Sequence, residues 1–70
     1  MKYLVVIEKA KRGFSGYLPD LPGCVVAAST RKGVEKAARQ AVAFHMDGMR
    51  AEGMRIPPPR TSSTYVAVRG

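Results

Sequence analysis

The chain has 70 residues and a formal net charge of +7, because 12 residues are Lys or Arg and only 5 are Asp or Glu. This length and a hydrophobic content of 46% are typical of one small globular domain, which we expect to span residues 1–70. So short a chain encloses little volume for a deep catalytic cleft, so the composition favours a binding module over an enzyme.

The cysteine content and the hydropathy pattern bear on the compartment in which the chain works. The single cysteine, Cys24, has no intramolecular disulfide partner, and the chain does not open with a signal-peptide pattern. The longest apolar run, residues 4–7, is far shorter than the roughly 20 residues that span a bilayer. We therefore expect a cytoplasmic protein that has no membrane partner.

Three strands are predicted in the first half of the chain. Residues 2–9 contain a run rich in β-branched and aromatic side chains, with apolar residues on both faces, which is typical of a central strand. After a charged turn, residues 14–18 alternate as a returning strand and form a hairpin with the first. Two prolines, an aspartate and a glycine in residues 19–23 predict a tight turn into a third strand over residues 24–28.

One long helix is predicted from residue 31 to about residue 52. Ser29 and Thr30 are N-cap types, the segment has no proline, and its apolar residues recur at helical spacing. The stripe expected to pack on the sheet consists of Val34, Ala37, Ala38, Ala41, His45, Gly48 and Met49. Its small residues, Gly48 among them, are expected to let the helix approach the sheet closely. Gly53 is placed to end the helix in a left-handed conformation.

The last predicted element is a strand over residues 61–69, which follows an extended polyproline segment at residues 57–59. The predicted order is therefore β-β-β-α-β. We expect an α+β fold with an antiparallel-rich sheet and one long helix packed on one of its faces.

The residues that carry chemistry are few and scattered. The carboxylates lie in different predicted elements, so no pair is forced together as an acid-base or metal site requires; they are Glu8, Asp20, Glu35, Asp47 and Glu52. Cys24 and His45 are a conceivable nucleophile and base, but both are expected to be packing residues, and they supply too few ligands for a structural zinc ion. We therefore predict no catalytic residue, no metal and no cofactor.

Basic residues in the first turn and on the outer face of the predicted helix offer an alternative function. They are Lys9, Lys11, Arg12, Lys32, Lys36, Arg39 and Arg50. Such residues can contact phosphates, and direct binding of RNA or DNA is the alternative hypothesis. Charges on an outer helix face are usually only solvated, however, and the aromatic residues are not interleaved with the basic ones as in single-strand binders.

Several segments carry a resemblance to a known family. Residues 16–24 read Gly-Tyr-Leu-Pro-Asp-Leu-Pro-Gly-Cys, after a first strand written Lys-Tyr-Leu-Val-Val-Ile-Glu-Lys. With the helix end Ala-Val-Ala-Phe-His-Met-Asp-Gly-Met at residues 41–49 and Ile-Pro-Pro at residues 56–58, the chain resembles the HicB antitoxin family over nearly its whole length. The resemblance implies a partial RNase H-like fold without the catalytic acids.

The same resemblance implies a function and a partner. Such an antitoxin binds a small HicA-like, mRNA-cleaving toxin and occludes its catalytic surface. Many members also carry a C-terminal DNA-binding segment, which we do not expect here. Tyr17, Asp20 and Leu21 are the candidate partner-binding residues, because they flank a rigid turn from which side chains can project.

Self-association is predicted from the size of the chain and from its thin core. Of the hydrophobic positions, many are alanine or methionine, so branched packing residues are scarce, and a homodimer or higher oligomer would add buried surface. An exposed sheet edge and the apolar flank around Phe44 and Met46 are the two candidate contacts, and the sequence does not choose between them.

Overall fold

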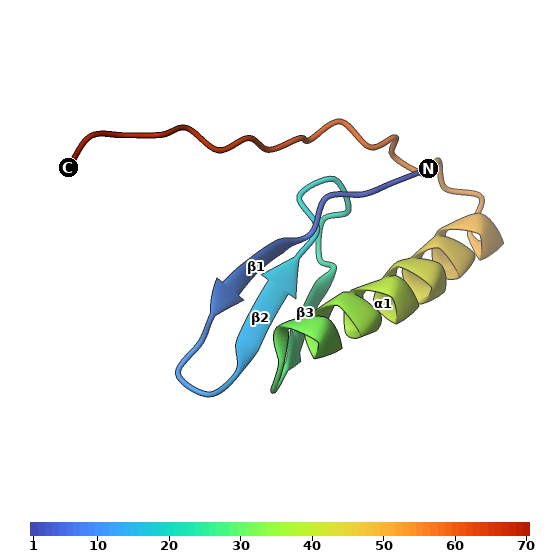
Figure 1. Cartoon of the computed structure of the whole chain (residues 1–70). Helices are drawn as coiled ribbons and strands as arrows, with labels where there is room; N and C mark the ends of the chain where they lie inside the picture. Colours follow the sequence, from blue (N-terminus) through green and yellow to red (C-terminus); the bar gives the residue numbers. More distant parts are fainter.

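The computed structural model describes all residues 1–70 and contains three strands followed by one helix. These are β1 (Val6–Lys9), β2 (Phe14–Tyr17), β3 (Val25–Ala28) and α1 (Arg31–Ala51). The strands form one antiparallel sheet in the order β1-β2-β3, and α1 packs on one face of it against β2 and β3 (Figure 1). The predicted α+β class, the antiparallel sheet and the single long helix on one face are confirmed.

The register of the sheet tells which side chains face the helix. Gly16 of β2 pairs with Ile7 of β1 and Val26 of β3. A Cβ atom built on Gly16 would lie 2.7 Å from Cγ1 of Val34 in α1, so this row of residues faces the helix. A side chain at position 16 would hold the two layers apart, which is why the strand carries glycine there.

Helix α1 begins and ends close to where the sequence predicts. Oγ1 of Thr30 accepts a hydrogen bond of 2.9 Å from the backbone N–H of Gly33, which is the expected N-cap. At the other end Gly53 adopts φ +69°, and its N–H donates to the carbonyl of Arg50. No helix of the structure is both long enough and apolar enough to cross a membrane.

The buried core is as small as composition predicts. Its hydrophobic members are Leu18, Leu21, Cys24, Val34, Ala38 and Met46. Two expectations about the helix are wrong in detail. Met46 points into the core, so of the predicted apolar flank only Phe44 is exposed, at 83%. Nothing lies within 4 Å of a Cβ built on Gly48, so that glycine does not permit a close approach of helix and sheet.

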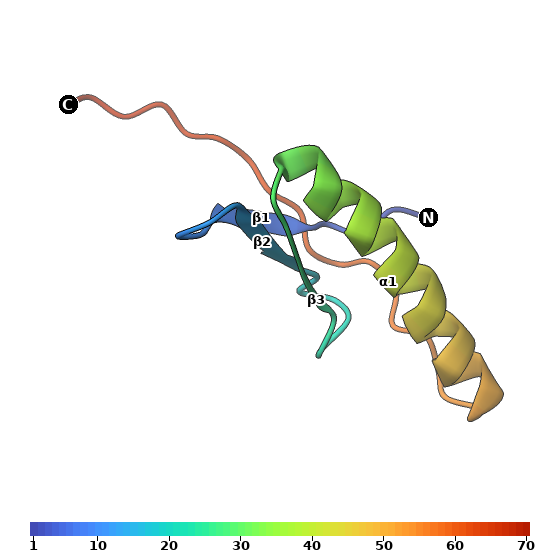
Figure 2. The ribbon, with the colours of Figure 1, turned by 90° about the horizontal axis from the view of Figure 1, so that it is seen from below.

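The predicted last strand over residues 61–69 is not formed. From Met54 to Gly70 no residue belongs to a helix or strand, and residues 60–70 are all exposed. Figures 1 and 2 both show the end of this segment, drawn in red, running away from the sheet. The radius of gyration is accordingly 13.9 Å, against about 11 Å for a compact chain of this length. The carboxylate of Asp20 holds the backbone at Arg60 and Thr61, and the residues that follow do not pair with either edge of the sheet.

Candidate binding surface

The face of the sheet opposite α1 is open to solvent. Side chains along a strand alternate between faces, so the neighbours of the helix-facing row point the other way. Val6, Tyr17 and Val25 stand side by side across the three strands, and Tyr17 and Val25 are 43% and 70% exposed. The next row on this face consists of Glu8, Ser15 and Ala27. We call these six residues the helix-free face.

The helix-free face differs in charge from the rest of the chain. It carries one acidic residue, Glu8, and no Lys or Arg, although 12 of the 70 residues are basic. One of its two rows is apolar, with an aromatic residue in the middle strand. Exposed apolar and aromatic side chains gathered in this way are typical of a protein-binding surface.

The three predicted partner-binding residues differ in exposure. Asp20 and Leu21 lie in the tight turn at residues 19–23, and Tyr17 ends β2 just before it. Leu21 is 0% exposed and belongs to the core, so the expectation that its side chain projects from the turn is wrong. The turn folds Leu21 inward because the backbone N–H of Leu21 donates to Leu18 and that of Cys24 donates to Leu21. Tyr17, at the start of this region, is the one that projects into solvent on the helix-free face.

Asp20 has a role that the sequence does not reveal, because its carboxylate binds the C-terminal segment of the chain. Oδ2 accepts hydrogen bonds from the backbone N–H groups of Arg60 and Thr61, both 2.9 Å long, and Oδ1 accepts one of 2.7 Å from the hydroxyl of Thr61. The backbone and hydroxyl hydrogen bonds from Thr61, followed by the one from Arg60, hold the pKa of Asp20 below its usual value of 3.8. Three residues before Arg60, the carbonyl of Pro57 accepts a hydrogen bond from the hydroxyl of Tyr3.

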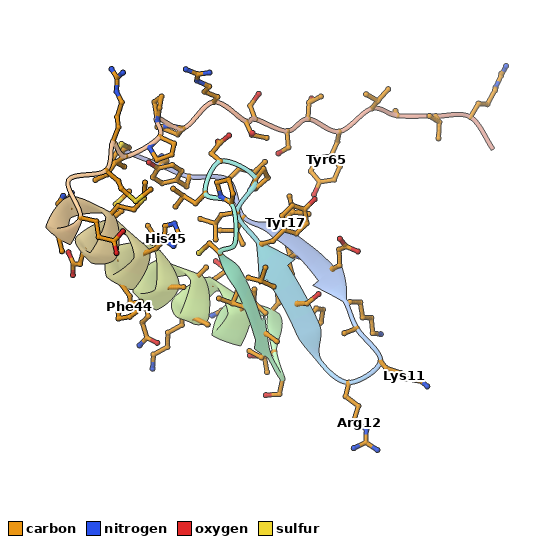
Figure 3. All side chains as sticks on the ribbon, turned by 180° about the vertical axis from the view of Figure 1, so that it is seen from behind. Lys11, Arg12, Tyr17, Phe44, His45 and Tyr65 are labelled. Carbon is orange, nitrogen blue, oxygen red and sulfur yellow. The ribbon has the colours of Figure 1, made fainter.

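The predicted basic residues lie at the end of β1, on the β1–β2 turn and along α1. Lys11 and Arg12 lie at the tip of the β1–β2 turn (Figure 3). The following residue, Gly13, packs against the end of β3: a Cβ built on it would lie 2.4 Å from the carbonyl oxygen of Ala28. This contact brings the basic turn beside the start of α1, where Lys32 is also exposed.

The remaining basic candidates lie at the end of β1 and farther along α1. Lys9 is exposed at the end of β1, and Lys36 and Arg39 are exposed farther along α1. Arg50 lies in the last turn of α1, where its guanidinium is 3.6 Å from the carboxylate of Asp47.

Cys24 and His45 are the two side chains that the sequence offers as a nucleophile and a base. Cys24 is a free, buried thiol, and burial raises its pKa. His45 is half-buried on α1 (Figure 3). No three His, Cys, Asp or Glu residues are close enough together to hold a metal ion.

Comparisons with known proteins agree with one another. The sequence model of the family described as "HicB_like antitoxin of bacterial toxin-antitoxin system" matches residues 3–69. A solved structure described as "HicA3 and HicB3 toxin-antitoxin complex" contains a chain that is 39% identical and superposes with a TM-score of 0.76. The match covers 87% of this chain and 72% of that one.

A curated relative gives a further comparison. It is an uncharacterised 14.9 kDa protein encoded in the rep-hol intergenic region of Haemophilus phage HP1. The two sequences are 32% identical over 66 residues, which are 94% of this chain and 50% of the relative. The chain thus spans about half the length of that relative.

Proposed function

Because this chain belongs to the HicB-like antitoxin family of bacterial toxin–antitoxin systems, we propose that it binds a small HicA-like toxin and covers the surface with which that toxin cleaves mRNA. The helix-free face carries this proposal, since it is the open apolar surface without basic residues. Occlusion needs no catalytic group on the antitoxin. The complex forms in the cytoplasm, where the toxin meets its mRNA substrate.

Charge supports the choice of this face. A toxin that binds RNA presents a basic surface, because contacts to phosphate come from Lys and Arg. Two basic surfaces in contact repel each other, and like charges across an interface cost on the order of several kcal/mol. A chain with a net charge of +7 therefore needs a face without cations, and the helix-free face meets that need while Glu8 adds a complementary charge.

Tyr17 is the residue that contributes most to binding in this proposal. It stands in the middle strand, between Val6 and Val25, so a docked partner removes it from water on all sides. Tyrosine at the centre of an interface is a common hot spot, because a rigid ring buries a large area at a low cost in conformational entropy. The flanking valines exclude water around the ring.

The test compares two exposed aromatic residues on different sides of the molecule. Tyr17→Ala is expected to weaken binding of a HicA-like toxin by about 30-fold, which corresponds to about 2 kcal/mol. Phe44→Ala is the matched control, because Phe44 projects from α1 away from the sheet (Figure 3) and is expected to leave affinity unchanged. Titration calorimetry measures the affinity, and an mRNA-cleavage assay measures the inhibition.

The two variants can also give the opposite result. If the toxin binds and only Phe44→Ala lowers the affinity of the complex, the toxin docks on α1 and the helix-free face is the wrong surface. If no complex forms and cleavage is not inhibited, the antitoxin proposal itself fails.

Direct nucleic-acid binding is the second candidate, and one observation favours it. The packing of Gly13 against Ala28 places Lys11 and Arg12 beside the start of α1 and Lys32, so cations from two distant segments gather at one end of the molecule. In this alternative, the double variant Lys11→Ala/Arg12→Ala lowers RNA affinity and reduces its dependence on salt, whereas Arg50→Ala does neither. Absence of any salt-sensitive binding by the unaltered chain removes this candidate.

A further inference from the structure

Strand β1 has the sequence of a central strand but lies at an edge of the sheet. Val6 and Ile7 face opposite sides, and both are half-buried, as is Val5 just before them. Strands with apolar residues on both faces normally have a neighbour on each side. In the order β1-β2-β3, the outer edge of β1 has none, so its backbone groups on that side are free to pair with another strand.

The C-terminal arm, residues 62–70, has no neighbouring strand with which to pair. It is extended and fully exposed, and its large apolar residues have exposed fractions of 99% for Tyr65, 77% for Val66 and 86% for Val68. Tyrosine and valine are strand-forming residues, so the arm has the composition of a strand without a sheet. Nine extended residues span about 30 Å, which is longer than β1 itself.

The arm does not reach β1 of its own chain because of the way it is anchored. The prolines at 57–59 stiffen the backbone before it, and the carboxylate of Asp20 holds the N–H groups of Arg60 and Thr61. From that anchor the arm leaves the molecule in both views (Figures 1 and 2). Because this anchor directs the arm away from its own sheet, the arm is free to pair with a second copy, and exchange of an identical element is a low-cost route to a dimer.

We infer that the C-terminal arm of one copy pairs with the free edge of β1 in a second copy, and that the exchange is reciprocal. Helix α1 packs on β2 and β3 and leaves the β1 side less covered. An open groove beside β1, lined by Val5, Leu18 and Val42 among others, can receive apolar side chains of the arm. The exchanged strand covers the edge and not the helix-free face, so the pairing does not depend on toxin binding.

Proline substitutions in the arm test the pairing. Neighbouring residues of a strand point their N–H groups to opposite sides, so either Val66→Pro or Ala67→Pro removes a hydrogen bond to β1. Sedimentation equilibrium of the 70-residue chain is expected to show a dimer, and at least one proline variant raises its dissociation constant about tenfold or more. Val66→Thr, which keeps the N–H and the β-branch, is the matched control and leaves the dimer intact.

The variants are suitable because their positions make no contact within the folded chain. Val66 and Ala67 are exposed, so the circular dichroism of the helix should match that of the unaltered chain. A chain that is monomeric at all accessible concentrations overturns the inference. A dimer that survives both proline substitutions overturns it too, because the copies then associate through another surface, such as the one around Phe44.

Cross-linking identifies which segments meet. In a Cys24→Ala background, chains with Glu8→Cys are mixed with chains that carry Val66→Cys, Ala67→Cys or Val68→Cys. Mixed disulfide-linked dimers are expected for at least one pair, because β1 of one copy then lies beside the arm of the other. Ala43→Cys, exposed on α1, replaces the arm cysteine as a control. Equal cross-linking of Glu8→Cys to this control contradicts the assignment.

Discussion

Asp20 illustrates how one residue can hold two distant parts of the chain together. Both of its oxygens accept hydrogen bonds from residues 40 and 41 positions later, so the turn at residues 19–23 also fixes the start of the C-terminal arm. Hydrogen bonds to the charged form of a carboxylate stabilise that form. The carboxylate of Asp20 is therefore already bound within the folded chain, and a partner would have to displace Arg60 and Thr61 from it.

The anchor at Asp20 is expected to depend on pH. Because the pKa in the folded chain is below the usual value of 3.8, the hydrogen bonds stabilise the anchored arm fully above that value and lose their contribution as the pH falls below it. The amide chemical shifts of Arg60 and Thr61, followed by NMR, should titrate with a midpoint below 3.8. Asp20→Asn should abolish the titration. A midpoint at or above 3.8 contradicts the assigned role.

Cys24 is expected to be unreactive in the folded chain. It is 5% exposed, and burial raises the pKa of its thiol, so little thiolate is present at neutral pH. Alkylation by iodoacetamide should therefore be slow in native buffer and fast in denaturant. Modification at the same rate under both conditions would show that the thiol is accessible in the folded state, and the buried position would then be wrong.

At the scale of elements, the contact between β2 and α1 depends on the absence of a side chain at Gly16. The neighbouring atom is Cγ1 of Val34, a residue that is completely buried and stiff because it is β-branched. The layer spacing is therefore set by one position in the strand. Gly48 in α1 offers the opposite case, since it is exposed and has open space around it.

These two glycines predict substitutions of opposite sign. Gly16→Ala should lower the free energy of unfolding by about 1–3 kcal/mol, because the new methyl group overpacks the contact with Val34. Gly48→Ala should raise it by about 1 kcal/mol, since alanine forms helix better than glycine. Urea denaturation measures both changes. Two changes of the same sign would mean that the packing of α1 on the sheet differs from the one described.

At the scale of the whole molecule, a small core and an extended arm make stability dependent on association. The chain buries few residues, and its radius of gyration exceeds that of a compact domain because the C-terminal arm lies outside the core. A domain this short is marginally stable alone. Reciprocal exchange of the arms would add buried apolar surface to both copies without changing the fold of either.

The unfolding temperature is therefore expected to rise with protein concentration. A folded dimer in equilibrium with unfolded chains is stabilised by mass action, so dilution lowers the melting temperature. Differential scanning calorimetry over a series of concentrations measures the effect, and the Val66→Pro and Ala67→Pro chains serve as comparisons in which it is reduced. An unfolding temperature that does not change with the concentration of the unaltered chain would show that association does not contribute to stability.

Local features of the sequence predicted most of the elements. Helix α1 is bounded by the cap at Thr30 and by Gly53, and the strands follow from runs of β-branched and aromatic residues between turns. The string at residues 16–24 likewise indicates the HicB-like family without any knowledge of the fold. These features are readable because each depends on residues close together in the chain, where backbone preference and side-chain periodicity act directly.

Tertiary structure alone decided which surfaces are available to partners. In the fold, Leu21 is buried, Tyr17 is exposed on a face without cations, and the carboxylate of Asp20 accepts hydrogen bonds at the start of the arm. It also left residues 61–69 unpaired, although their composition is that of a strand. Burial and strand pairing are set by contacts between residues far apart in sequence, and a strand forms only where a free edge lies within reach. That is why the sequence predicted the family, the helix and the first three strands, whereas only the fold showed the face proposed for binding and the unpaired arm.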